Sequence, residues 1–541
     1  MMSKLMLTMI PLLPLLLAMG YAWRPAGAWL VAAPTAALAG ALWVPVDSAV
    51  SLPWLLLGVH WQLDPVGQTF LLFSALAWLI VSLFVAADSR SYIRARHYGV
   101  LFLSALAGNL LLIVAADLIS FYIGFAMMGL SAYGLLLKPS QRARRAARVY
   151  LGFTLAGELA LFLALLLLAL NADSLLIADL HASAVPDLAI GLLLIGFGIK
   201  VALPGLHPWL PLAYSSAPLI SVAVLSGPMM KAGLLGWLRF MPRDQPGLGA
   251  WGELLIALGF GGLLLGTILA LLQRRPSAIL AYSSVAKMGL ISLLFGYALA
   301  NPQAAPQVLG ALVLFAMHHL MTKTALFIGL HQLQAENTGR WTYPGMVLLA
   351  LGMAGLPLGG GLAAKTALGQ ATGADLANLL LFAGFAGALM MLHFVYRVHQ
   401  ERITRNTQAK TTGHWQMAAH GAWWALLPLA FWAPFAPIAG GFDFKALLII
   451  LAAGALLWLS HRLIQPGELP RLFRPGDVYH LLYRIRLRPP LQLAPRVNAS
   501  VRPPVLKLSS LVPGEGSLLL PGLAWLIVTF LLLGVMFAPI F

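Results

Sequence analysis

Long apolar segments alternate with short polar segments along almost the whole chain. A membrane-spanning helix needs about 20 mostly apolar residues, and sixteen segments approach or exceed that length. They are residues 4–20, 27–45, 68–88, 98–115, 117–137, 149–170, 187–205, 217–240, 251–272, 277–299, 306–332, 343–367, 376–398, 419–437, 444–460 and 517–539. The first lacks a clear small-residue cleavage site and a second span follows at once, so we interpret it as a helix and not as a signal peptide. The pattern predicts an all-α polytopic membrane protein with about 16 transmembrane helices.

Basic residues cluster in the loops that follow odd-numbered spans. They are Arg90, Arg94 and Arg96 after span 3, Arg142, Arg144, Arg145 and Arg148 after span 5, Arg274 and Arg275 after span 9, Arg340 after span 11, Arg397, Arg402, Arg405 and Lys410 after span 13, and Arg462 to Lys507 after span 15. Basic loops face the cytoplasm, so both termini are expected on the non-cytoplasmic side of the inner (cell) membrane. Arg239 and Arg243, after span 8, are the exception.

The composition agrees with a membrane location and excludes several chemistries. Of 541 residues, 60% are hydrophobic and 9% charged, against about 25% charged in soluble domains. The net charge of +17 follows from the basic loops, so we expect no nucleic-acid partner. Without cysteine, the chain has no disulfide, thiolate metal site or iron–sulfur ligand. We also find no nucleotide loop, metal-ligand spacing or nucleophile–base pair, and expect no catalytic site, cofactor or metal in this chain.

Residues 461–513 form the one long polar segment, with Pro-rich runs at 486–490 and 502–504. Proline interrupts helices, so we expect this segment to lie along the cytoplasmic surface before the last span. It either contacts lipid headgroups or forms a linker.

Five of the ten lysines fall inside apolar spans: Lys200, Lys231, Lys287, Lys323 and Lys365. Each costs about 2.5–3.5 kcal/mol in a membrane. A lysine near a helix end can extend its ammonium group to the surface, but this does not explain five in successive helices. Lysine, unlike arginine, can lose its proton when buried, so the series predicts a proton relay.

Two further residues extend this relay. His319 lies four residues before Lys323 and therefore on the same helix face, whereas the adjacent His318 is expected to point elsewhere. Glu158 is the one glutamate deep inside a span. It is either the carboxylate that accompanies the lysines or a protonated, hydrogen-bonded structural residue.

Glycine and proline interrupt two of the lysine-bearing spans. Lys200 lies between Gly196 and Pro204, and Lys365 follows the segment 357–361. Broken helices are tolerated where they line a polar cavity, and paired interruptions indicate inverted repeats. We therefore expect two inverted five-helix repeats, residues 98–240 and 251–398, with broken helices 7 and 12. N-terminal helices at 1–97 and a C-terminal region at 399–541 would flank them.

The run Gly198-Ile-Lys-Val-Ala-Leu-Pro-Gly-Leu-His-Pro-Trp209 resembles the signature of the proton-translocating antiporter-like subunits. These subunits occur in respiratory complex I, Mrp-type sodium/proton antiporters and membrane-bound hydrogenases. Further matches are Leu225-Ser-Gly-Pro-Met-Met-Lys-Ala-Gly233, Leu280-Ala-Tyr-Ser-Ser284 and His319-Leu-Met-Thr-Lys-Thr-Ala-Leu-Phe327. The resemblance covers roughly residues 90–400.

The resemblance implies at least fourteen helices, two inverted repeats and a central hydrated polar axis. It also implies a role for each matching residue. Lys200 would be the lysine paired with a glutamate, Lys231 and His319 with Lys323 would connect the two halves, and Lys365 would be the terminal site. His207, just beyond the first break, would be a gate between the membrane surface and the axis.

Two positions depart from the family pattern. The expected glutamate of span 5 is Ala126 here, and we expect Glu158, on the next helix, to replace it. Lys287 stands where a histidine or another polar residue is common.

The leading hypothesis is a proton-translocating antiporter-like subunit of a multisubunit membrane complex, with other membrane subunits as partners. One alternative is an Mrp-type sodium/proton antiporter subunit resembling its D subunit. Others are a membrane partner of a hydrogenase, a quinone oxidoreductase or an inorganic-carbon uptake system, and a scaffold that has lost transport.

Overall fold

The computed structural model describes residues 1–463 except 56–57, 173, 182–183, 243–244, 246, 335–340, 358, 404–413 and 432–442. Within this part, ten helices are long and apolar enough to cross a membrane, which confirms a mostly helical, multi-pass membrane protein. The count of sixteen spans stays a prediction. The expected last span, 517–539, and most of the polar segment 461–513 lie outside the described residues.

The N-terminal region contains one feature that the all-α prediction missed. Its helices are α1 (Met2–Trp23), α2 (Gly27–Ala32), α3 (Thr35–Trp43), α4 (Pro65–Ala87) and the short α5 (Ser91–Arg94). Between α3 and α4, β1 (Ala49–Leu52) pairs antiparallel with β2 (Val59–Gln62). A second correction concerns the expected span 27–45, which is divided into α2 and α3 at Ala33 and Pro34. Proline lacks the amide hydrogen that a continuous helix would use there.

The first half of the relay lies on the helices that follow. These are α6 (Arg96–Val114), α7 (Leu118–Leu135), α8 (Gln141–Leu170), a short 3-10 turn (Asp179–His181), α9 (Asp187–Val201), α10 (Trp209–Ser216), α11 (Leu219–Val224), a π-helical turn (Leu225–Met229) and α12 (Met230–Phe240). Span 7 is thus interrupted between α9 and α10, as expected, and span 8 is interrupted at the π-helical turn. Basic residues expected in the loop before span 6 instead occupy the first turns of α8, where Arg144 and Arg148 are exposed.

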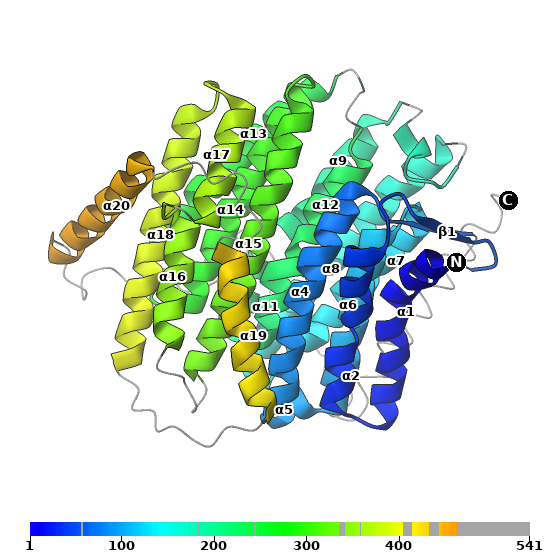
Figure 1. Cartoon of the computed structure of the whole chain (residues 1–541). Coiled ribbons are helices and arrows are strands. Elements are labelled where there is room, and N and C mark those ends of the chain that lie inside the picture. Colours follow the sequence, from blue (N-terminus) through cyan, green and yellow to red (C-terminus); the bar gives the residue numbers. More distant parts are fainter. Residues whose placement is uncertain are drawn as a thin grey trace, which may run out of the picture. The chain divides into compact units, whose positions relative to one another are not determined.

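The second half follows in a similar order. Its helices are α13 (Leu248–Leu271), α14 (Pro276–Ala300), α15 (Ala305–Gln334), α16 (Thr342–Ala354), α17 (Gly360–Thr372), α18 (Ala377–Ile403), α19 (His414–Phe431) and α20 (Phe444–Leu463). Span 12 is interrupted between α16 and α17. In Figure 1, α15 lies among α4, α11 and α19, and direct packing of α15 against each of these helices agrees with this view.

Glycines allow α13 and α14 to approach very closely. Gly259 and Gly266 are seven residues apart and therefore lie on one face of α13. A Cβ atom at Gly259 would lie 2.5 Å from the backbone nitrogen of Leu293, and one at Gly266 would lie 2.4 Å from that of Ala286. Small residues at such positions are the usual means of close helix packing in membranes.

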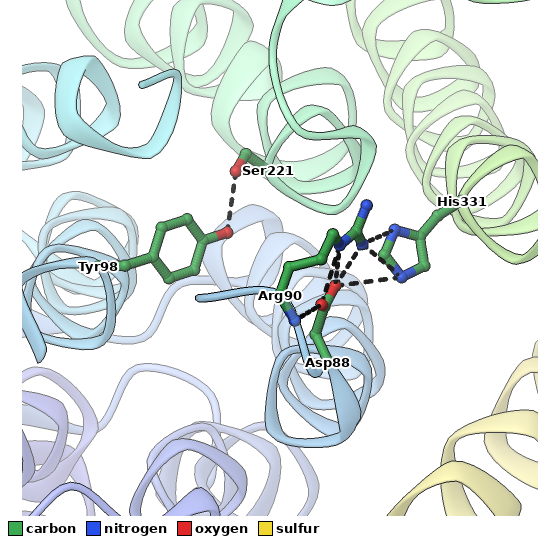
Figure 2. A network of polar contacts seen from close by, with 5 residues as sticks. All are labelled: Asp88, Arg90, Tyr98, Ser221 and His331. Carbon is green, nitrogen blue, oxygen red and sulfur yellow. Dashed lines mark hydrogen bonds and ion pairs between the residues drawn. The ribbon is translucent and has the colours of Figure 1, made fainter. Parts of the chain in front are cut away.

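A polar network joins the end of α4 to the end of α15 (Figure 2). Arg90 donates hydrogen bonds to both carboxylate oxygens of Asp88, and its Nη2 atom also contacts Nδ1 of His331 at 2.8 Å. The side chains of Asp88 and His331 are 2% and 8% exposed. Burial alone would lower the pKa of Arg90, but the hydrogen bond and negative charge of Asp88 raise it above its ordinary value. Arg90 therefore stays charged and holds the two helices together.

Arg239, an exception to the loop-charge pattern, is not a loop residue. It lies in the last turn of α12, and its guanidinium donates to the carbonyl oxygens of Leu112, Ile113 and Ala115 and to Asp64. Those carbonyls end α6 and have no partner within that helix. Arg239 thus has a packing role, whereas Arg243 lies outside the described residues.

Candidate proton-relay site

Lys200 lies in the last turn of α9, directly before the first break. Ala202 has φ 60°, a left-handed conformation that ends the helix. The Lys200 side chain turns back toward α8, where its Nζ atom donates to the hydroxyl oxygen of Tyr150 at 3.1 Å. That hydroxyl in turn donates to the carbonyl oxygen of Gly129 on α7 at 3.0 Å. Lys200 is only 4% exposed, so this hydrogen bond holds an ammonium group inside the helical bundle.

Glu158 on α8 lies beside Gly129, close to Lys200. It is 6% exposed, and its Oε1 atom has no hydrogen-bond partner. A Cβ atom added to Gly129 would be 2.5 Å from this oxygen and 3.2 Å from Nζ of Lys200. Glu158 therefore lies beside the turn of α7 that follows Ala126, the position where the resemblance implied a glutamate. In the described part of the chain, however, no ion pair joins Glu158 to Lys200.

His207 lies in the segment 202–208 that separates α9 from α10, and it is 2% exposed. Just beyond it, Nε1 of Trp209 donates to the carbonyl oxygen of Ile199 at 2.9 Å, and this oxygen also accepts the backbone N–H of Ala202. The ring of Trp209 also meets the ring of Tyr150 edge to face at 5.3 Å. His207 thus lies two residues before Trp209, which packs against Tyr150, although no described hydrogen bond joins His207 to the relay.

The centre of the site is a direct contact between α12 and α15. The ammonium of Lys231 donates to Nδ1 of His319 at 2.8 Å and to the carbonyl oxygen of Ser226 at 2.9 Å. That carbonyl is available because the π-helical turn, with Gly227 at non-helical φ and ψ, interrupts the regular hydrogen-bond pattern. Lys231 is fully buried and His319 is 1% exposed.

Lys323 lies one turn beyond His319 on α15 and is fully buried. Its Nζ atom donates to the carbonyl oxygen of Leu280 at 2.7 Å and to the hydroxyl of Ser283. Both acceptors belong to the Leu280–Ser284 motif on α14. Lys231, His319 and Lys323 therefore form a continuous group of buried basic side chains across α12, α15 and α14.

Lys287 lies on α14 and is 2% exposed. Its Nζ atom has no hydrogen-bond partner, and it lies 5.8 Å from the centre of the Phe315 ring. A Cβ atom added to Gly387 on α18 would be 2.7 Å from this nitrogen. Lys287 thus places an ammonium group between α14, α15 and α18.

His318 points in another direction from His319, as expected for an adjacent residue. Its Cε1 atom would be 3.1 Å from a Cβ atom added to Gly361 at the start of α17, a direction that the sequence did not specify. It therefore faces the second break, while His319 faces Lys231. Adjacent residues on a helix point about 100° apart. The two neighbouring histidines can therefore face the second break and Lys231 at the same time.

Lys365 lies on α17, after the second break, and is partly buried. Its Nζ atom donates to the carbonyl oxygen of Ala354 at 2.7 Å. Ala354 is the last residue of α16, where Gly355 adopts φ 104°. The second break therefore leaves a backbone carbonyl that accepts a hydrogen bond from Lys365.

The structure groups the predicted residues into three clusters: Glu158 with Lys200, Lys231 with His319 and Lys323, and Lys365 at the second break. The sequence did not reveal Tyr150, Ser283 or the role of His318. A signal for Tyr150 exists, because it lies eight residues before Glu158 and hence on a similar face of α8. No three His, Asp or Glu side chains among the described residues are grouped to hold a metal ion.

Comparison with known proteins identifies relatives and structural neighbours of this chain. Hydrogenase-4 component B of Escherichia coli is 30% identical over 279 residues, which cover 47% of this chain and 41% of that protein. The matched region thus spans about half the length of the curated relatives. Among solved structures, the Mrp complex from Dietzia sp. DQ12-45-1b matches with a TM-score of 0.68 and 22% identity, covering 90% of this chain and 59% of that one.

Respiratory complex I from Thermus thermophilus with bound NADH gives a TM-score of 0.67 at 21% identity, covering 83% of this chain and 99% of that chain. These structural matches show a shared fold. The model of the family described as NADH:quinone oxidoreductase/Mrp antiporter, transmembrane region, matches residues 115–391. This range is half of the chain and contains every residue of the candidate relay. The chain therefore belongs to the NADH:quinone oxidoreductase/Mrp antiporter family.

Proposed function

We propose that this chain is a proton-translocating antiporter-like subunit of a multisubunit membrane complex. The observation that carries the proposal is the group formed by Lys231, His319 and Lys323. Lysine and histidine can each give up and take back a proton, and burial makes the charged form costly. A 2.8 Å contact between an ammonium and an imidazole is short enough for direct proton transfer.

The relay would begin at Lys200 and end at Lys365. Glu158 would stabilise the charged form of Lys200 when the two side chains approach, and the approach of a second positive charge would favour release of its proton. Two like charges about 4 Å apart repel by about 4 kcal/mol at an effective dielectric constant of about 20. This repulsion is large enough to move a proton from one buried base to the next.

Lys287 and His318 would connect the central cluster to the second break. The free ammonium of Lys287 and the imidazole of His318 lie on the two helices, α14 and α15, that also carry the centre of the site. Water molecules would complete the longer steps, because a buried unpaired polar atom normally has an ordered water as its partner.

The alternative of sodium/proton exchange fits the likeness to the Mrp complex, but the site offers few ligands for sodium. A hard cation needs several oxygen ligands. The carbonyl oxygens of Ser226, Leu280 and Ala354 already accept hydrogen bonds from lysines, and these positive charges would repel the ion. We therefore favour the proton, and a sodium pulse that drives proton movement in vesicles would reverse this choice.

The proposed function is tested with the full chain in its native complex. Proton uptake by membrane vesicles is measured for Glu158→Gln and Lys200→Ala, with Arg144→Ala on the exposed face of α8 as the control. We expect both relay variants to lose uptake and the control to retain it. Unchanged uptake in both relay variants would contradict the proposal. Co-purified subunits would show whether the partner is an electron-transfer, Mrp-like or carbon-uptake module.

A further inference from the structure

Lys200 donates its hydrogen bond to Tyr150 although a carboxylate lies close by. Glu158 is the only carboxylate adjacent to Lys200 among the described residues, yet its Oε1 atom is unpaired while the ammonium binds a neutral hydroxyl. A hydrogen bond to a carboxylate is normally the stronger of the two. The two acceptors lie on one helix, α8, and both adjoin Gly129.

We propose that Tyr150 is a positioning residue that holds Lys200 apart from Glu158, so that the ammonium alternates between the tyrosine hydroxyl and the carboxylate. The arrangement seen here, with Lys200 bound to Tyr150, is the separated state. Movement of the ammonium past Gly129 to Oε1 of Glu158 gives the paired state. This inference rests on the proposed function and assigns the structural element that opens and closes its first ion pair.

The geometry around Tyr150 fits a fixed acceptor. Its hydroxyl proton is committed to the carbonyl oxygen of Gly129, so its lone pairs face Lys200. Trp209 packs against its ring at 5.3 Å, and Tyr150 is only 2% exposed. A residue held on both sides in this way stays in place while the flexible lysine moves.

The surroundings of the ammonium also allow both states. Lys200 Nζ lies 5.1 Å from the centre of the Tyr150 ring and 5.6 Å from that of Phe125, and aromatic faces attract a cation. Gly129 places no side chain between the two acceptors. The ammonium has three donors and uses one in a described hydrogen bond, so a change of acceptor leaves no additional donor unpaired.

The proposal is tested by a double-mutant cycle in native membrane vesicles with Tyr150→Phe, Glu158→Gln and the double variant. Tyr150→Phe keeps the ring and removes the acceptor, which favours the paired state. A hydrogen bond to a charged group is worth about tenfold or more in an equilibrium constant. We therefore expect Tyr150→Phe to lower proton uptake about tenfold in the wild-type background, and to change the residual uptake of the Glu158→Gln protein by less than about twofold. Equal losses in both backgrounds would overturn the proposal.

Infrared spectroscopy provides a measurement that does not require transport. The band of the protonated Glu158 carboxyl group is assigned by its loss in Glu158→Gln, and the pH is set where it has half its maximum intensity. We expect Tyr150→Phe to weaken this band at that pH, because the ammonium then pairs with the carboxylate. Tyr98→Phe is the matched control, since Tyr98 is also buried and its hydroxyl contacts Ser221 at 2.8 Å. An unchanged band in Tyr150→Phe contradicts the proposal.

The two proposals can fail separately. If Glu158→Gln and Lys200→Ala retain full proton uptake, the proposed function is wrong, whereas the infrared band still reports whether Tyr150 positions Lys200. If those two variants lose uptake but Tyr150→Phe leaves both uptake and the band unchanged, only the role of Tyr150 is wrong.

Discussion

Gly129 shows how one residue determines what its neighbours can do. The carboxylate of Glu158 and the ammonium of Lys200 approach the same point beside α7, and only a residue without a side chain leaves that point open. Residue 126 is alanine where the resemblance implied a carboxylate, and the glutamate on α8 lies beside the adjacent turn of α7. A carboxylate therefore lies close to Lys200, although it is carried by α8 and not by α7.

We expect Gly129→Ala to impair proton transport without unfolding the protein. The new methyl group would lie 2.5 Å from Oε1 of Glu158 and 3.1 Å from Cγ2 of Thr154. The carboxylate ends a flexible side chain and can move aside, so the fold is kept but the approach to Lys200 is blocked. Proton uptake in vesicles and thermal stability in detergent measure the two effects.

Gly152→Ala is the matched control, since Gly152 lies on α8 and nothing lies within 4 Å of an added Cβ atom. It should keep full uptake and gain stability of about 1 kcal/mol or less. If Gly129→Ala transports protons at the control rate, the point beside Gly129 is not part of the mechanism.

Single residues also mark the limit of sequence reasoning. Lysines in apolar segments are visible in the sequence because their burial is costly, and all five lie where a break, an interruption or a helix contact supplies surroundings for them. Tyr150 was missed because tyrosine is common in membrane helices and carries no charge. The direction of His318 depends on how α15 is rotated against α17, which the spacing of one helix cannot determine.

At the scale of elements, two of the helix interruptions supply a carbonyl oxygen to a lysine. The π-helical turn supplies that of Ser226 to Lys231, and the end of α16 supplies that of Ala354 to Lys365. An unbroken helix would use these carbonyls internally. The glycines and prolines at these points therefore allow the buried lysines to be solvated by the backbone.

We expect Gly355→Ala to disturb the second break. Gly355 has φ 104°, which residues with a side chain rarely adopt, and its Cβ atom would be 2.8 Å from Nζ of Lys365. Such backbone strain costs about 1–3 kcal/mol, and the ammonium would also be displaced from Ala354. The expected result is a lower melting temperature together with lower proton uptake.

Gly369→Ala on α17 is the control, because nothing lies within 4 Å of its added Cβ atom. A Gly355→Ala protein that melts and transports like Gly369→Ala would show that the left-handed turn is not needed to hold Lys365.

At the scale of the whole molecule, the sequence predicted the helical, multi-pass character and the two breaks. Both depend on local signals, namely the length of the apolar segments and the positions of glycine and proline within them. It missed the β1–β2 hairpin, which forms in a loop too short and mixed in composition to show a clear alternation. It also assigned Arg239 to a loop. The partners of Arg239 are carbonyls of α6, more than 120 residues away in sequence, so its role becomes visible only when the helices are packed together.

The network of Asp88, Arg90 and His331 connects distant parts of the chain and is expected to stabilise their packing. In Arg90→Ala, the carboxylate of Asp88, with 2% of its side chain exposed, loses its guanidinium partner. Leaving a buried acceptor unsatisfied costs about 1–3 kcal/mol, and the partial exposure of Arg90 places the effect at the lower end. We expect a lower melting temperature in detergent. The melting temperature should fall less for Arg90→Lys, which keeps the positive charge but lacks the planar guanidinium group.

The same experiment separates packing from transport. Arg144→Ala removes an exposed arginine from α8. It should change the free energy of unfolding by no more than about 0.5 kcal/mol and leave the melting temperature essentially unchanged. Because Arg90 keeps its proton and makes no described contact with the lysines of the relay, Arg90→Ala should keep its proton uptake per folded molecule. If Arg90→Ala has the melting temperature of the unchanged protein, then α4 and α15 are held together by their apolar faces alone. Loss of uptake at full stability would instead place the network in the proton path.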